Sequence, residues 1–164
     1  MTSREPLTLW RQSHWEIRGA RDAESFFRSV GSLEGTVLFL EGSSQPPAVQ
    51  QVLAKQRVPG PYLPERQTAW RPPEQWRLSS GGEALSDLAE LAASHAEPEL
   101  ADHVFIYAGD SALLEWPDAF ASDSPILISA AVAEKVVRDL AHRLAGTVRW
   151  IDGAVQQGDE ADEA

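Results

Sequence analysis

Residues 103–116 read HVFIYAGDSALLEW, and this stretch decides the fold class. Residues 103–108 are rich in β-branched and aromatic side chains, which favour a strand. Gly109 and Asp110 then supply a two-residue turn signal, and residues 112–116 continue as a second strand. The pattern predicts a β-hairpin, and a hairpin excludes an all-parallel sheet.

Four further segments around this hairpin read as strands. Residues 13–19 alternate polar and apolar side chains, which predicts a half-buried strand at a sheet edge. Residues 36–41 contain four consecutive apolar residues, which suits a strand covered on both faces. Residues 125–129 and 147–151 complete the set, so we expect about five or six strands.

Four segments have helical spacing of their apolar residues, and three of them carry a start or stop signal. Asp22 can cap a helix over residues 22–30, and Pro46 and Pro47 can open the next one. Ser129 and Gly146 bracket the strongest helical pattern in the chain. The helical segments are residues 22–30, 46–57, 83–94 and 130–145.

These elements predict a single α/β domain over residues 1–152, with a mixed β-sheet that includes one hairpin and with helices packed on it. Residues 58–82 interrupt the pattern with five prolines, two tryptophans and several arginines. We interpret them as an ordered excursion, because a pure linker has no aromatic side chains to bury. Residues 153–164 form an acidic tail that we expect to be disordered.

The composition is that of a soluble globular protein, with 43% hydrophobic and 24% charged residues. Cysteine is absent, which excludes disulfides, thiolate zinc sites and cysteine nucleophiles, and fits a reducing, cytoplasmic compartment. The first ten residues lack the apolar core of a signal peptide, and no apolar run reaches 18 residues. The excess of arginine over lysine is typical of a GC-rich bacterial genome.

The charge distribution is the most informative functional feature. Residues 78–134 contain eleven carboxylates and no lysine or arginine, in a chain of net charge −11. A one-signed block attracts basic surfaces and repels nucleic acid and anionic lipid. We therefore expect a non-enzymatic module that binds a basic protein partner, such as an immunity or antitoxin-like protein or an assembly subunit. The block is also consistent with a role in solubility alone.

The partner-binding residues that we predict combine the acids of this block with nearby aromatic side chains. Aromatic anchors rimmed by charge commonly carry binding energy at protein interfaces. The predicted residues are Glu97, Glu99, Asp110, Glu115, Trp116, Asp118, Phe120 and Asp123.

An alternative hypothesis is an enzyme or small-ligand binder at the end of the strand over residues 36–41. Ligands often bind at strand ends, and a following helix N-terminus can bind an anion. The residues of this alternative site are Glu41, Gly42, Ser43, Ser44 and His103. A nucleotide-binding glycine motif is missing here, and serine before a helix is most often a simple cap.

No catalytic, metal or cofactor motif rises above chance. His95 and His103 flank several acids, but their spacing matches no known metal-binding pattern. Ser111 lacks the second glycine of a nucleophile elbow. We therefore predict no catalytic residue, no metal and no cofactor, and we expect neither nucleic acid nor membrane as a partner. The sequence leaves the oligomeric state open.

Overall fold

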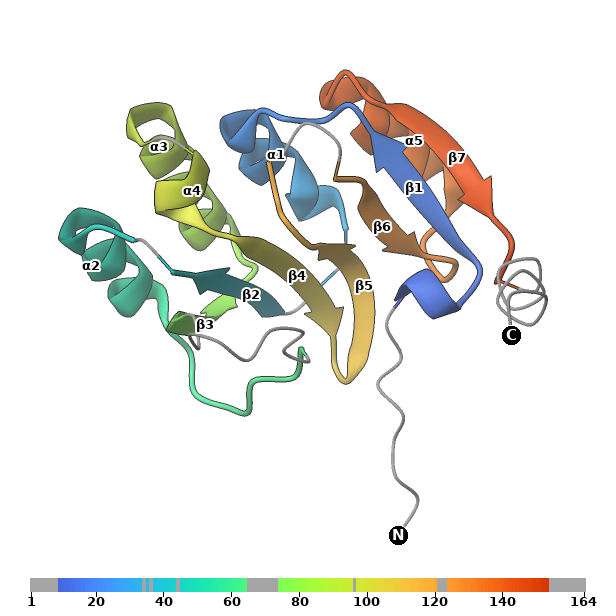
Figure 1. Cartoon of the computed structure of the whole chain (residues 1–164). Helices are drawn as coiled ribbons and strands as arrows, with labels where there is room; N and C mark the ends of the chain where they lie inside the picture. The colour runs from blue at the N-terminus through green and yellow to red at the C-terminus, as the bar shows by residue number, and fades with distance from the viewer. Residues whose placement is uncertain are drawn as a thin grey trace, which may run out of the picture.

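The computed structural model describes residues 9–33, 35, 37–43, 45–64, 74–95, 97–120 and 124–153. Within them the chain alternates short helices and strands (Figure 1). The elements are η1 (Leu9–Arg11), β1 (His14–Arg18), α1 (Ala23–Ser29), η2 (Val30–Ser32), β2 (Val37–Gly42), α2 (Pro47–Gln56), β3 (Glu74–Ser79), α3 (Gly82–Ser94), α4 (Glu97–Leu100), β4 (His103–Ala108), β5 (Ser111–Trp116), β6 (Ile126–Ser129), α5 (Glu134–Arg143) and β7 (Thr147–Ile151).

Seven strands of the described residues form one sheet in the order β3-β2-β4-β5-β6-β1-β7. Every neighbouring pair is antiparallel, so the α/β class is confirmed while the mixed sheet and the count of five or six strands are wrong. The predicted hairpin is present as β4–β5, with a register shift at Ile106 and Tyr107. Its turn places Gly109 at a φ of 59°, a conformation that glycine adopts without strain.

The strand absent from our prediction is β3, which lies inside the excursion. Trp76 and Leu78 point to the buried side while Gln75 and Arg77 alternate with them, which is ordinary strand spacing. The prolines just before β3 obscured this signal. Where the excursion begins, the chain lies beside this edge strand: Arg57 pairs with Leu78, and the Val58 N–H donates to the Arg77 carbonyl at 2.9 Å.

The helices cover one face of the sheet, and Figure 1 shows α1 between α3 and α5 behind the strands. The main core lies between these layers. Its aromatic centre consists of Phe26 and Phe27 from α1 with Trp116 and Phe120. A smaller apolar cluster lies on the opposite face, where Phe39 contacts Tyr62 of the excursion and Tyr107 of β4. Leu38 and Phe39 are neighbours on β2 and point to opposite faces of the sheet, and both are fully buried, so both faces of this central strand are covered.

The helix boundaries follow local chemistry. Asp22 caps α1 as predicted, because its side chain accepts the N–H of Glu24, and α2 opens on prolines. The last helix is shorter than residues 130–145: it begins at Glu134, and Ser129 instead caps a separate turn by accepting the N–H of Ala131. Ala145, rather than Gly146, takes the left-handed conformation after α5, at a φ of 54°.

Strand β1 is not an edge strand, since it lies between β6 and β7. This position buries His14 and Glu16, which the alternation had placed on an exposed side. No helix among the described residues is long and apolar enough to cross a bilayer.

Candidate functional site

Four exposed carboxylates and one partly exposed carboxylate of the acidic block lie on α3, on α4 and in the turn after β5. Helix α3 carries Glu83, Asp87 and Glu90 at spacings of four and three, which places them on one side of the helix. Glu99 follows on α4, and Asp118 lies in the turn after β5. We call these five residues the acidic surface. The side chain of Asp118 is 82% exposed and that of Glu83 is 78% exposed.

Backbone hydrogen bonds tie α4 and the turn after β5 to the same end of the sheet. Asp102, two residues after α4, donates its N–H to the Glu41 carbonyl at 2.6 Å. The carbonyl of Asp102 in turn accepts the N–H of Ala119 at 2.9 Å. Asp118 donates its N–H to Nδ1 of His103 at 2.9 Å, so the proton of the neutral imidazole lies on Nε2. The turn that presents Asp118 is therefore fixed to β4.

The same turn contains two non-glycine residues whose backbones are in the left-handed conformation. Asp118 has a φ of 48° and Phe120 has a φ of 68°, both outside the range preferred by non-glycine residues. Burial of the Phe120 ring against Phe26 and Trp116 holds this conformation in place. The core thus presents the Asp118 carboxylate to solvent at a defined position.

Trp116 and Phe120 are core residues, so the predicted aromatic anchor of the binding patch is wrong. Trp116 is fully buried and donates its indole N–H to the Ser124 carbonyl at 3.1 Å. Phe120 is 2% exposed. The alternation within β5 explains the difference, because Trp116 shares a face with Leu114, which packs against the helices.

The other acids that we predicted to bind a partner do not lie on one surface. Glu115 is buried on the face opposite the helices, so it cannot contribute to an acidic surface. Asp110 is exposed in the hairpin turn, at the other end of β4 and β5 from Asp118. Glu99 is exposed and lies 3.4 Å from Nδ1 of His95. The side chain of Glu97 and all of Asp123 lie outside the described residues.

The arginine–carboxylate ion pairs among the described residues lie away from the acidic surface. Arg28 binds Glu24 on α1, and Arg138 binds Glu134 on α5. Arg18 and Arg149 both bind Glu16. Among the ion pairs that the structure describes, the acidic surface receives only one lysine, Lys55. Its Nζ lies 3.9 Å from both Glu83 and Asp87, and its side chain is 67% exposed, so the pairing is weak.

The fold brings the residues of the alternative site together, but the protein's own side chains already occupy the hydrogen-bonding groups of that site. Glu41 and His103 are cross-strand partners on β2 and β4. Glu41 is 4% exposed, and its Oε1 accepts hydrogen bonds from the Tyr62 hydroxyl at 2.8 Å and the Gln75 amide at 3.5 Å. The carboxylate is thus occupied within the fold.

The end of β2 beyond Glu41 offers an anion few free N–H donors and little space. The N–H of Ser43 already donates to the Asp102 carboxylate at 2.8 Å. A side chain at Gly42 would collide with Gln45, whose amide bridges Trp76 and the Leu100 carbonyl. Proline at the N-cap (Pro46) and at the first position of α2 (Pro47) removes N–H donors that would otherwise bind an anion. Ser44 lies outside the described residues.

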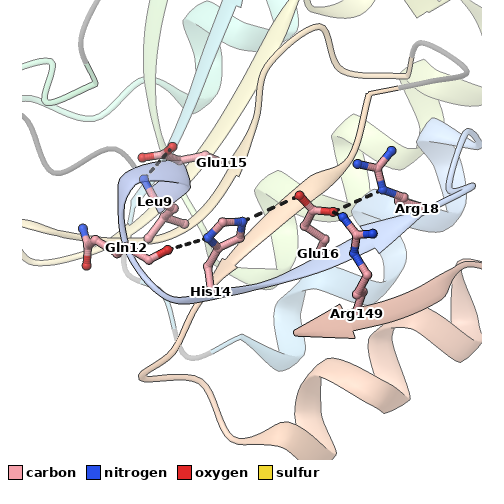
Figure 2. A network of polar contacts seen from close by, with 7 residues as sticks. All are labelled: Leu9, Gln12, His14, Glu16, Arg18, Glu115 and Arg149. Atoms are coloured by element: carbon pink, nitrogen blue, oxygen red, sulfur yellow. Dashed lines mark hydrogen bonds and ion pairs between the residues drawn. The ribbon is translucent and has the colours of Figure 1, made fainter. Parts of the chain in front are cut away.

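Sequence reasoning missed a buried polar network on the helix-free face (Figure 2). Glu16 on β1 is 7% exposed and binds Arg18 at 3.1 Å and Arg149 at 3.5 Å. His14, 1% exposed, donates from Nδ1 to the Gln12 carbonyl at 2.7 Å, and its Nε2 lies 3.8 Å from Glu16. The two-residue spacing of His14 and Glu16 was visible, but the strands that bury them are distant in sequence.

Glu115 is the other end of this network. Its Oε2 accepts the backbone N–H of Leu9 at 3.1 Å, as Figure 2 shows. Burial raises the pKa of the Glu115 carboxyl from 4.5 to about 7, and the hydrogen bond from Leu9 opposes this rise only in part. The group therefore titrates near neutral pH.

Comparison with known proteins gives no family for this chain: no family model, no curated protein and no solved structure matches it. Among the described residues, no group of three histidine, aspartate or glutamate side chains is arranged to hold a metal ion. The functional argument therefore depends on the geometry and charge of the surface described above.

Proposed function

We propose that this protein is a non-enzymatic binding module whose acidic surface engages a basic surface of another protein. One observation carries the proposal: among the described residues, the arginine–carboxylate ion pairs lie on α1, α5 and β1, while Lys55 is the only lysine or arginine that pairs with the acidic surface, besides contacts with His95 and His103. Unneutralised carboxylates on neighbouring elements produce a negative potential that favours a cationic partner.

The acidic surface is narrower than the sequence alone suggested. It runs from α3 through α4 to the turn after β5 and excludes Glu115, Trp116 and Phe120. Binding energy therefore comes from charge pairs and hydrogen bonds made by exposed carboxylates, rather than from an aromatic anchor. Such interfaces gain association rate and specificity from electrostatics more than they gain affinity.

A rigid platform supports this type of recognition. Asp118 is fixed by its N–H bond to His103, and Glu90 and Glu99 lie on helices. Carboxylates on fixed backbone lose less conformational entropy on binding than carboxylates on a free loop. An immunity or antitoxin-like protein that masks a basic toxin, or a subunit of a larger assembly, fits this chemistry. We expect such a partner to be encountered in the cytoplasm.

The proposal is tested by affinity capture from an extract of the native host at low salt, with elution by increasing salt. Two matched variants decide the result. The first carries Glu90→Lys, Glu99→Lys and Asp118→Lys, and the second carries Asp159→Lys, Glu160→Lys and Glu163→Lys. Both variants change the net charge by the same amount. Loss of the captured protein only in the first variant supports the proposal, and equal loss in both would show that net charge alone is responsible.

A further inference from the structure

The 3-10 turn η1 (Leu9–Arg11) lies on the face of the sheet that carries no α-helix, which we call the helix-free face, and a buried carboxylate holds it there. Leu9 is 2% exposed, and its N–H donates to Glu115 on β5, 106 residues away, at 3.1 Å. The neighbouring strands place apolar residues on both sides of Glu115, since Phe105 of β4 and Leu127 of β6 are its cross-strand partners. The carboxylate therefore lies in an apolar setting under the N-terminal segment.

No cation of the described residues forms an ion pair with Glu115. Arg11 on η1 directs its guanidinium over the Trp10 ring, 4.8 Å from the ring centroid. Strand β6 has no ionisable residue. The other ionisable groups on this face include Glu41 on β2, Arg77 on β3, His103 and Tyr107 on β4, His14, Glu16 and Arg18 on β1, and Arg149 on β7. Strand β6 separates β5 from β1, so Leu127 lies between Glu115 and Glu16 in the sheet. A charge on Glu115 is thus compensated by a single backbone hydrogen bond.

The chain after η1 is anchored independently of Glu115. The Gln12 carbonyl accepts Nδ1–H of His14 at 2.7 Å, and the Ser13 hydroxyl accepts the N–H of Gly153 at 3.0 Å. These contacts fix the C-terminal side of the turn to β1 and to the end of β7. Movement of residues 9–11 would pivot at this anchored point without disturbing the sheet.

We infer that Leu9–Arg11 forms a strap over the helix-free face of the sheet, and that the strap opens when the Glu115 carboxyl loses its proton. The closed strap keeps the carboxyl away from water, which disfavours its charged form. An open strap exposes Glu115 to water, along with the apolar surface of Leu127 beside it. The chain therefore couples the protonation of one residue to the exposure of a surface.

The direction of the coupling follows from linkage. The pKa of Glu115 is about 7 with the strap closed and returns toward 4.5 when the carboxyl is hydrated. The open state thus binds fewer protons, and rising pH favours it through this window. For a full return to 4.5, the ratio of open to closed strap increases about tenfold between pH 6 and pH 8.

Native-state hydrogen exchange of the full chain tests this inference. Protection factors, which are corrected for the intrinsic effect of pH on exchange, are measured at pH 6 and pH 8 for the amides of Leu9 and Gln12. The Gln12 amide reports closure because it donates to the Leu9 carbonyl at 3.0 Å. Amides of β2 serve as the reference for global unfolding.

We expect strap protection to fall about tenfold from pH 6 to pH 8 in the wild type, while protection in β2 changes little. The Glu115→Gln variant retains an acceptor for Leu9 and should show no such fall. An exposed control, Glu99→Gln, should behave like the wild type. Constant strap protection in the wild type, an equal fall in β2, or a fall that persists in Glu115→Gln would each overturn the inference. Glu115→Met is a second uncharged variant and should likewise show no fall. If neither variant folds, the wild-type comparison of the strap with β2 still tests the inference.

Discussion

The backbone N–H of Asp118 donates a hydrogen bond to Nδ1 of His103, and this contact joins the turn after β5 to the start of β4. It fixes a carboxylate whose side chain is 82% exposed at the end of the sheet where α4 leads into β4. The acidic surface therefore depends on packing within the central hairpin as well as on the charge of the sequence.

Ala145 offers the simplest test of the backbone geometry. Its φ of 54° is a left-handed conformation that glycine adopts without the steric cost of a Cβ. We expect Ala145→Gly to raise the free energy of unfolding by about 1 kcal/mol. Urea denaturation followed by circular dichroism measures this change.

The matched control for that substitution is the next residue. A Cβ on Gly146 would lie 2.7 Å from the Ile17 side chain and 2.9 Å from the Arg18 carbonyl oxygen. Gly146→Ala should therefore destabilise the fold by roughly 1–3 kcal/mol, since it overpacks the contact between α5 and β1. A stabilising Gly146→Ala, or a destabilising Ala145→Gly, would contradict the described C-terminus of α5.

Gln45 is the second structural test. Its side chain is buried, accepts the Trp76 indole N–H at 2.7 Å and donates to the Leu100 carbonyl at 2.7 Å. Gln45→Leu keeps a similar volume but leaves both partners unsatisfied, so we expect a loss of roughly 2–5 kcal/mol in the free energy of unfolding. Gln51→Leu on the exposed side of α2 is the control, and we expect it to cost less than about 1 kcal/mol. Equal effects would show that Gln45 does not join β3 to the end of α4.

Glu115 should make stability depend on pH in a recognisable direction. Its pKa in the folded protein, about 7, is above its unfolded value of 4.5, so the folded state loses stability as pH rises through this window. Glu115→Gln removes the ionisation and should raise the free energy of unfolding at pH 8 by up to about 3 kcal/mol. The gain should shrink toward pH 5. Denaturation curves of both proteins at several pH values measure it, and a gain that is constant with pH would exclude titration of Glu115 as the cause.

The sequence predicted the parts of the fold whose signals are local. The hairpin over residues 103–116, the Asp22 cap and the prolines that open α2 all appear as expected, because turns and caps are determined by a few adjacent residues. Strand β3 was missed because prolines precede it, although Trp76 and Leu78 alternate correctly. The strands were therefore undercounted by one.

The candidate site was harder to predict, for a physical reason. Alternation indicates which residues share a face, but it does not indicate what covers that face. Glu115 is buried by Leu9, which lies more than a hundred residues earlier in the chain, and His14 and Glu16 are buried because β6 and β7 flank β1. The burial of Trp116 could have been predicted, because it lies two residues after Leu114 on the same strand and therefore shares its buried face. Its proximity to acids in sequence suggested an interface that the fold does not provide.

The acidic surface should act mainly on the rate of association. Opposite charges accelerate encounter at low salt, and screening removes that advantage as ionic strength rises. For a partner captured from the host, we expect the association rate of the wild type to fall at least roughly tenfold between low and physiological salt. A rate that does not change with salt would indicate recognition by apolar contacts instead.

The most direct test of the binding proposal compares association rates of the two charge-matched variants with that purified partner at low salt. The account predicts that Glu90→Lys, Glu99→Lys and Asp118→Lys together slow association by roughly tenfold or more, while the tail variant at Asp159, Glu160 and Glu163 stays close to wild type. Equal rates for the two variants, with both folded by circular dichroism, would contradict it.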